Sequence, residues 1–322
     1  MCDLLTPAGS VRPHSPVPLP SFFLVGPPRT GTSWLHEVLG RRMQLPTDVK
    51  ETRFFDVHYH RGWQWYRAHY PETSVYSVAG EVAPTYFASA TARARIVETI
   101  QAAKVVCIFR EPIARIESLY RVKCAYGMIG CTFEEALQRD PELLESSRYA
   151  THLNAWQSAL GKDRVLALVY DDLCQSPQAF LDRLADFIGL ERFALAPSEM
   201  RRVRPSASLT RPRNYYRTRA LIRLSNWCKC RGLHRVVATV RNSPLHRLCL
   251  GGGSPFPPMS LTTKARLYEV LRSEIDELET LLNRDFALWK GLAPLQRDAR
   301  QVFPTLTEGG IPNPNIRSEP CL

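Results

Sequence analysis

A short apolar stretch that ends in a glycine-bounded loop is the most constraining feature of this sequence. Residues 22–25 (Phe-Phe-Leu-Val) carry no charge, which predicts a buried strand, and Gly26-Pro27-Pro28 ends it. A helical pattern then begins at residues 31–33 (Gly-Thr-Ser). Backbone N–H groups and the helix dipole converge at such a junction, so we expect an anion site there, most often for phosphate.

The loop departs from a nucleoside-triphosphate loop at one position. Gly26, Gly31 and Ser33 have the expected spacing, but Thr32 occupies the place of the lysine. Arg29 is the only cation in the loop. We therefore expect an anion other than a Mg²⁺-bound triphosphate. An ordinary Gly/Pro turn is the alternative that the loop alone leaves open.

The chain length allows one large α/β domain, which we place at residues 21–292 of the 322. Residues 1–20 contain five prolines and predict a disordered leader rather than a secretory signal, and residues 293–322 predict a tail. No run of 18 apolar residues predicts a membrane span. Nine scattered cysteines then favour reduced thiols and a cytoplasmic protein.

The positive charge is concentrated in one segment. The net charge is +11, and residues 201–247 hold twelve arginines and one lysine but no Asp or Glu. Such cations repel one another, which predicts an anionic ligand, acceptor or surface; a solvated helical face is the alternative. We expect no nucleic acid partner, while peripheral membrane contact through Arg201–Arg247 is one option. A basic nucleic-acid- or membrane-binding protein, with the sheet as a scaffold, is a further alternative function.

Apolar strands and amphipathic helices alternate along the chain. Further strands are expected at 77–81, 104–109 and 165–169, and helices at 34–41, 90–101, 113–126, 147–160, 178–188 and 261–282. Within the basic segment, residues 216–227 suit a short helix, and residues 251–258 a hinge or loop. The alternation predicts a three-layer, P-loop-like α/β domain whose central parallel sheet has four or five strands, with helices on both faces.

A second basic loop follows the strand at 104–109. Arg110-Glu111-Pro112 opens a helix that carries Arg115 and Ser118. The carboxyl ends of parallel strands share one edge of the sheet, so this loop and the first are expected to meet where ligands bind. Arg110 and Ser118 are placed to share one phosphate. A helix opening with exposed arginines is the alternative.

These two loops resemble the sulfotransferases that use 3′-phosphoadenosine 5′-phosphosulfate (PAPS). Residues 26–35 (Gly-Pro-Pro-Arg-Thr-Gly-Thr-Ser-Trp-Leu) are similar to the family's 5′-phosphosulfate loop, and residues 109–120 to its 3′-phosphate motif. Tyr-Asp-Asp-Leu at 170–173 and Phe-Ile-Gly-Leu at 187–190 resemble a further family segment. The resemblance covers residues 20–190 and implies an enzyme that moves a sulfuryl group to a hydroxyl or amine, without a metal.

The resemblance also implies roles for the loop residues. Arg29 stands where the family has a lysine that polarises the transferring group. The cofactor-binding set for the 5′-phosphate would be Thr30, Gly31, Thr32, Ser33 and Trp34. Arg110 and Ser118 would bind the 3′-phosphate. Arg211 and Arg213 would return over that phosphate from the basic segment.

Glu51 is the candidate base. Residues 51–56 (Glu-Thr-Arg-Phe-Phe-Asp) resemble the Glu-x-x-Phe-Phe-Asp of the heparan-sulfate type enzymes, and residues 80–86 their Gly-Glu-Lys-x-Pro-x-Tyr. Val82 replaces that lysine, so a second catalytic cation is missing from its expected place. His36, His58 and His60 are alternative bases.

Other assignments stay open. Cys228, Cys230, His234, His246 and Cys249 match no common zinc module, so we expect no metal site. A P-loop nucleoside or sugar kinase is the alternative enzyme. The acceptor, whether a glycan, a lipid or a natural product, is not specified, and residues 63–70 are either an aromatic sugar platform or part of the core.

Overall fold

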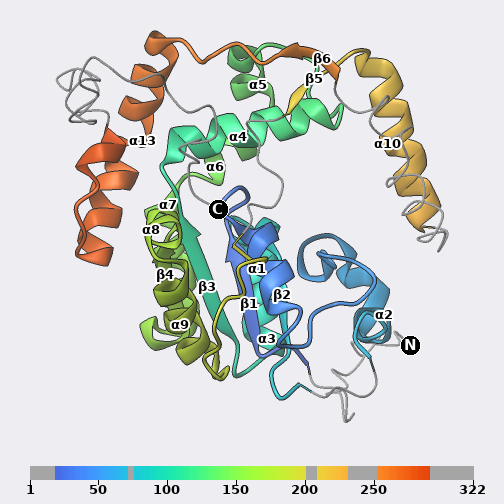
Figure 1. Cartoon of the computed structure of the whole chain (residues 1–322), viewed down its shortest axis with the longest axis vertical. Helices are drawn as coiled ribbons and strands as arrows, with labels where there is room; N and C mark the ends of the chain where they lie inside the picture. Colours follow the sequence, from blue (N-terminus) through green and yellow to red (C-terminus); the bar gives the residue numbers. More distant parts are fainter. Residues whose placement is uncertain (1–18, 72–75, 201–208, 231–251, 291–322) are drawn as a thin grey trace, which may run out of the picture.

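The computed structural model describes residues 19–71, 76–200, 209–230 and 252–290 (Figure 1). The predicted leader lies outside the described residues except for its last two positions, and the tail and most of the zinc candidates lie wholly outside them. Within the described part, no helix is long and apolar enough to cross a membrane.

Four parallel strands form the central sheet, in the order β2-β1-β3-β4. Phe22 pairs with Gly80 on one side and with Lys104 on the other, so β1 lies inside the sheet. The strands are almost wholly buried, as the apolar runs at 22–25, 104–109 and 165–169 predict. Their bounds are β1 Phe22–Gly26, β2 Gly80–Val82, β3 Lys104–Phe109 and β4 Val165–Val169.

Helices cover both faces of this sheet, which confirms the predicted three-layer architecture. Alternate side chains of β1 enter different cores: Phe23 and Val25 face one, Phe22 and Leu24 the other. The first core is closed by α3 Ala90–Thr99, α4 Pro112–Ala125, α7 Tyr149–Leu160 and α13 Leu261–Leu282. The second is closed by α1 Thr32–Leu39, α8 Tyr170–Gln175 and α9 Pro177–Ile188.

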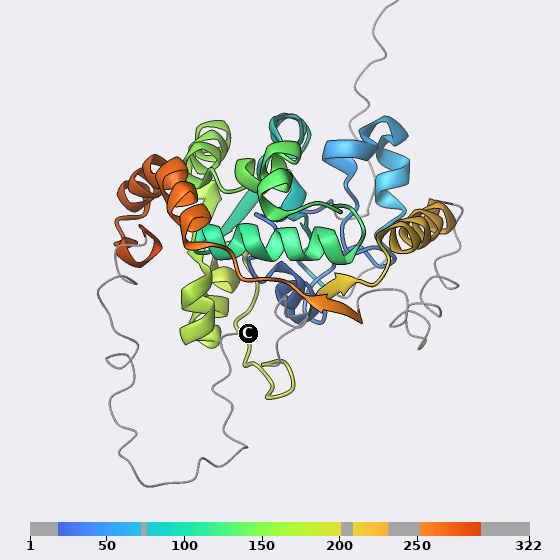
Figure 2. The ribbon, with the colours of Figure 1, turned by 90° about the horizontal axis from the view of Figure 1, so that it is seen from above.

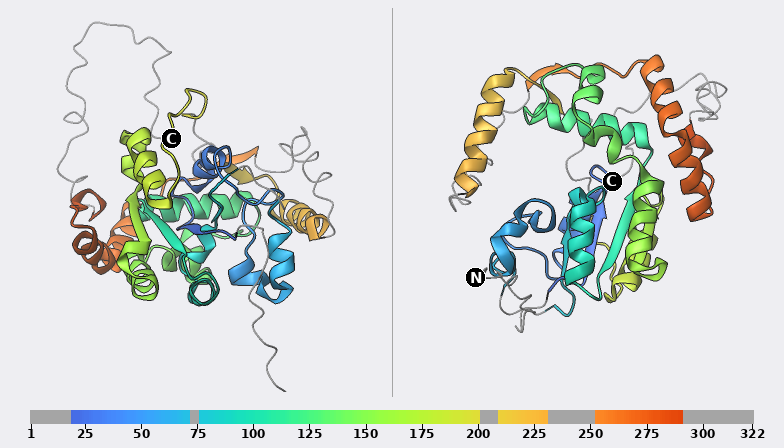
Figure 3. Two further views of the ribbon diagram at one scale, coloured as in Figure 1. Left: turned by 90° about the horizontal axis from the view of Figure 1, so that it is seen from below. Right: turned by 180° about the vertical axis from the view of Figure 1, so that it is seen from behind.

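Helix α4 crosses the edge of the sheet and links two outlying helices. α13 lies toward one end of α4, and α10 (Tyr215–Cys230) toward the other (Figures 1 and 3). Seen from above, α4 runs across the top of the domain (Figure 2). Shorter helices complete the structure: α2 Gly62–Arg67, α5 Phe133–Arg139 and α6 Glu142–Glu145.

The basic segment differs from its sequence prediction at one point. Residues 251–258, expected to be a hinge or loop, include strand β6 (Gly252–Pro255), which pairs antiparallel with β5 (Thr210–Pro212). Strands rich in Gly and Pro lack the apolar alternation that identifies a strand in the sequence. This two-stranded sheet brings together both ends of the stretch that contains α10.

Candidate active site

The loop after β1 leaves the N-terminus of α1 open toward the sheet edge. Gly31 occupies the N-cap position in the left-handed region, with φ 87°, and supplies no capping side chain. The N–H groups of the first helical turn therefore have no acceptor within the helix. A Cβ on Gly31 would lie 3.0 Å from a methyl group of Leu173, a tight contact, and the left-handed backbone angle itself favours glycine.

Arg29 joins this loop to the second one. Its φ of 77° is also left-handed, and its Nε donates to Ser118 Oγ at 2.9 Å. Arg110 donates to the backbone oxygen of Arg29 at 3.2 Å and lies 5.0 Å from the ring centroid of Tyr170. The structure thus brings Arg29 into contact with Arg110, which lies 81 positions further along the chain, and with Ser118, which lies 89 positions further.

Other polar groups of the two motifs face inward. Thr30 is fully buried and donates to Pro27 O, and Trp34 is 2% exposed with its indole N–H bonded to Glu199 O. The Trp34 side chain therefore packs in the core, and only its backbone N–H faces the candidate anion site. Arg115 is also fully buried, held by Ser147 and Leu143, so it supports α4 from within.

Lys50 is a site residue that the sequence reasoning did not assign. Its Nζ lies 3.2 Å from Ser33 Oγ in the loop and 3.0 Å from Glu51 Oε1. Both side chains are about one quarter exposed (28% and 24%), so they are accessible to a ligand. Glu51, the candidate base, therefore lies beside the 5′-side of the predicted anion site together with a cation.

A buried carboxylate holds the segment that carries Glu51. Glu81 accepts hydrogen bonds from the N–H and hydroxyl of Thr52, at 3.0 and 2.6 Å, and from Tyr66 and Tyr86. Its burial raises the pKa of Glu81 above the usual range. Since Thr52 follows Glu51 directly, this network fixes the backbone on which the candidate base stands.

The aromatic stretch at 63–70 belongs mainly to the core. Tyr66 is fully buried and stacks on Phe54 at 4.5 Å between centroids, and Trp63 packs half-buried against the same ring. These contacts decide the question that the sequence left open for Tyr66 and Tyr70 in favour of packing.

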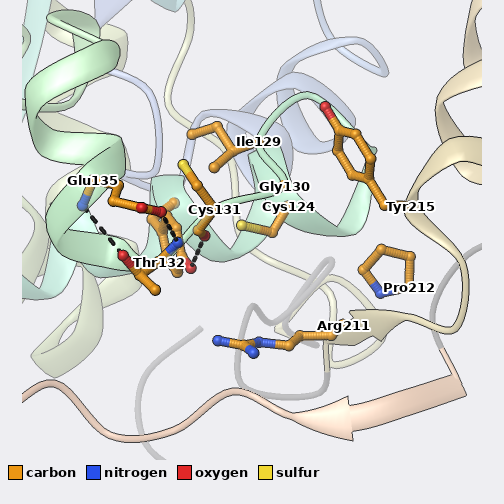
Figure 4. Close-up of a pocket in the computed structure, with 10 residues that line it drawn as sticks. Cys124, Ile129, Gly130, Cys131, Thr132, Glu135, Arg211, Pro212 and Tyr215 are labelled. Atoms are coloured by element: carbon orange, nitrogen blue, oxygen red, sulfur yellow. Dashed lines mark hydrogen bonds between the residues drawn. The ribbon is translucent and has the colours of Figure 1, made fainter.

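Arg211 lies in β5, close to α4, and Arg213 lies directly after β5. Arg213 donates to Gly252 O, and Arg211 lies over the ring of Phe256 at 5.8 Å. Arg211 lines a cavity of about 340 Å³ beside Tyr120 (Figure 4). Ser118 and Tyr120 are two positions apart on a helix and point to different sides, so a role of Arg211 at the 3′-phosphate stays a prediction.

The three histidines stay alternative bases, and the structure describes the surroundings of His58. His58 packs edge-on against Trp65, and burial and the neighbouring arginines lower its pKa. Among the residues that the structure describes, no group of three or more His, Cys, Asp or Glu side chains could hold a metal ion.

The donor set of this edge fits a ligand with two anionic ends. One group of donors comprises the open N-terminus of α1, Ser33 and Lys50, the other comprises Arg110 and Ser118, and Arg29 joins the two. The profile of the sulfotransferase domain matches residues 19–223 of the chain. The chain belongs to the sulfotransferase family. Its members take the sulfuryl group from PAPS, an anion with this two-ended charge.

Relatives and solved sulfotransferases agree with this assignment. Mouse heparan sulfate glucosamine 3-O-sulfotransferase 3A1 is 30% identical over 183 residues, which cover 54% of this chain and 47% of that protein. Bovine bifunctional heparan sulfate N-deacetylase/N-sulfotransferase 2 is 28% identical over 198 residues, covering 54% and 22%. The chain spans about half the length of the 3-O-sulfotransferases that it matches.

The crystal structure of a sulfotransferase from Alicyclobacillus acidocaldarius shares the fold. It superposes with a TM-score of 0.61 at 16% sequence identity, over 85% of this chain and 100% of that one. This likeness supports the sheet order and the layers of the sulfotransferase domain.

Proposed function

We propose that this protein transfers a sulfuryl group from PAPS to a hydroxyl or amine of an acceptor, leaving adenosine 3′,5′-bisphosphate. The observation that carries the proposal is the hydrogen bond from Arg29 to Ser118, because it unites the two motifs at one edge of the sheet. In the reaction the sulfur–oxygen bond to the 5′-phosphate breaks, a bond to the acceptor forms, and the acceptor loses a proton.

The loop residues would hold the 5′-end of the donor nucleotide. The open N–H groups of α1 and the hydroxyls of Thr32 and Ser33 suit a phosphate whose negative charge grows during transfer. Arg110 and Ser118, with Arg29 between them and the loop, would hold the 3′-phosphate. Preorganised donors of this kind stabilise charge without rearrangement.

Glu51 would accept the proton of the acceptor. A carboxylate within hydrogen-bond reach of the hydroxyl is the common solution for such a step. The contact with Lys50 keeps Glu51 beside Ser33 and so beside the 5′-end of the nucleotide.

Lys50 would supply the second catalytic cation, which is missing from its expected place because Val82 replaces the lysine there. Val82 is fully buried and cannot reach the ligand, while Lys50 is the cation in contact with both Ser33 and the proposed base. We therefore assign Lys50, together with Arg29, to stabilise the negative charge that moves to the leaving phosphate.

We propose a glycan as the acceptor. The names of the heparan sulfate relatives favour a glycan. Lipid and natural-product acceptors stay alternatives. A cytoplasmic location also stays a prediction of the sequence.

The test combines ligand-induced stabilisation with an activity assay. Adenosine 3′,5′-bisphosphate without metal should raise the melting temperature, since a ligand at 100 times its Kd adds about 2.7 kcal/mol to stability. Purified protein should then release this bisphosphate from PAPS when glycan acceptors are added. Stabilisation by Mg²⁺-ATP alone would contradict the proposal and favour the kinase alternative.

A further inference from the structure

The helix α10 exposes several of its large apolar and aromatic side chains. Thr218 is its most buried described side chain, at 1% exposed, while Tyr216 is 80%, Leu224 55% and Trp227 54% exposed. Amphipathic helices of a globular domain normally turn their apolar stripe to the core. Here the apolar stripe points outward.

This outward stripe is continuous and bordered by arginines. Tyr216, Ala220, Leu224 and Trp227 follow one another at spacings of four, four and three residues, which places them on one face. At 3.6 residues per turn, Arg217 falls on one border of that face and Arg219 and Arg223 on the other. All three arginines are exposed, and α10 contains no Asp or Glu.

The base of α10 is held firmly against the domain. A Cβ on Gly127, just after α4, would lie 2.9 Å from the backbone nitrogen of Arg219, so the first turns of α10 sit directly on that loop. The ring of Tyr215 lies equally close to Gly130. The helix therefore presents its outer face in a fixed direction rather than as a loose arm.

We propose that α10 is an interfacial helix that docks this protein on an anionic lipid bilayer. An apolar stripe with Trp and Tyr, bordered by arginines, matches a helix lying at the headgroup level. The arginines meet anionic headgroups while Leu224 and Trp227 enter the acyl boundary.

Two other occupants fit the helix less well. A two-fold contact with a second copy would place arginines of one helix against those of the other, and like charges repel. A sulfated or carboxylated glycan would pair with the arginines but would leave Leu221 and Leu224 exposed to water, at 39% and 55%. Of these three occupants, a bilayer takes up both the charge and the stripe.

In Figures 1 and 3, α10 and the lobe around α2 lie on the same side of the molecule. That lobe follows the Lys50–Glu51 pair directly in the chain. Docking through α10 would therefore bring the candidate active site toward the membrane. This inference does not depend on sulfuryl transfer, since it rests on α10 alone.

Sedimentation of the full chain with vesicles tests the proposal. Vesicles of phosphatidylcholine with 30% phosphatidylserine should bind the protein, vesicles of phosphatidylcholine alone should not, and binding should weaken as salt is raised. The combined Arg217→Gln, Arg219→Gln, Arg223→Gln variant should bind about 100-fold more weakly, from roughly a fivefold loss per arginine. Leu224→Glu should lose about tenfold or more.

Matched controls lie on the opposite end of the molecule. Arg272→Gln and Leu288→Glu change an exposed arginine and an exposed leucine near α13, and both should bind vesicles like the unchanged protein. Quenching of tryptophan fluorescence by brominated lipid should fall in Trp227→Phe. Stabilisation by adenosine 3′,5′-bisphosphate should persist in every variant, which separates loss of docking from loss of fold or of the active site.

Three outcomes would overturn the proposal. The first is equal vesicle binding by the α10 variants and the controls. The second is that the protein binds heparin through the same arginines but does not bind anionic vesicles. The third is a dimer in light scattering that Leu224→Glu dissociates while vesicles are ignored.

Discussion

Two strand–loop–helix units meet at the carboxyl edge of the sheet: β1 leads into α1 and β3 into α4. The first turn of α1 has no side-chain cap, whereas Glu111 closes α4 by accepting the N–H groups of Ile113 and Ala114 at 2.9 and 2.6 Å. The N-terminus of α1 can therefore bind an anion through its backbone. The β3–α4 unit contributes only side chains, chiefly Arg110 from the loop and Ser118 from α4.

Because of this difference, we expect the two units to have different roles. The β1 side, with Lys50 and Glu51, would act on the transferring group, and the β3 side would anchor the nucleotide. Variants on the first side should therefore change turnover, and variants on the second should change affinity for the nucleotide.

Glu51→Gln should have the largest effect on turnover. Removing a general base lowers kcat by about 10²–10⁴-fold, while the affinity for adenosine 3′,5′-bisphosphate should not change. Steady-state kinetics and calorimetric titration measure the two quantities. Glu37→Gln, an exposed position on α1, is the matched control and should be neutral. Full turnover in Glu51→Gln would remove Glu51 as the base.

Lys50→Met should reduce kcat by about 10²-fold, the usual effect of losing one charge-stabilising donor. Lys50→Arg should recover part of the rate because it keeps the cation. Arg29→Met should reduce both kcat and nucleotide affinity, since Arg29 also contacts Ser118. If Lys50→Met changed only the affinity and not kcat, Lys50 would belong to the anchor.

Arg110→Ala should weaken binding of the bisphosphate by about 10–100-fold, the value of a hydrogen bond to a charged group. Binding of adenosine 5′-monophosphate, which lacks the 3′-phosphate, should be nearly unchanged. Arg121→Gln, on the helix that follows Arg110 and paired with Glu117, serves as control. Equal losses for both nucleotides would place Arg110 at the 5′-end instead.

Glu111→Ala should lower the free energy of unfolding by about 1 kcal/mol, as expected for a lost helix cap. Urea denaturation measures this loss. Affinity for the bisphosphate should persist, because Glu111 seals α4 and does not face the ligand. A large drop in affinity would contradict the division between an open and a closed helix.

The smallest expected effect is a pH dependence from Glu81. Burial raises its pKa in the folded state, so between the unfolded pKa and the raised one the folded protein holds more protons. Its contribution to stability must then fall as pH rises through that window. Thermal unfolding across pH should show this fall in the unchanged protein, and Glu81→Gln should flatten it.

The sequence predicted what depends on local pattern. The strands Lys104–Phe109 and Val165–Val169 and the helix Leu261–Leu282 were confirmed at their bounds, because apolar runs and a regular helical stripe are strong signals. The strand predicted at 77–81 was wrong in extent. The observed strand β2, Gly80–Val82, is only three residues long, and no pattern in the sequence marks where its pairing begins.

The candidate site was predicted through its motifs and missed where contacts are distant. Arg29 and Ser118 were each assigned, but their bond joins positions 89 apart, and no pattern states which side chains will meet. Lys50 was not assigned from the sequence, because its contact with Ser33 arises from the path of the loop between α1 and the sheet. The burial of Arg115 also depends on Leu143 of α6 and on Ser147, which lies just before α7, because both accept hydrogen bonds from its guanidinium.

The pairing of β5 with β6 holds residues 210–212 against residues 252–255. The two ends of the intervening chain therefore lie side by side. Lengthening a loop whose ends are already held together adds only about 0.6 kcal/mol of closure entropy per doubling. A change in the length of the stretch from 213 to 251 should therefore cost the domain little stability. We expect that a longer or shorter segment grafted between β5 and β6 would leave the sheet and its nucleotide loops as they are.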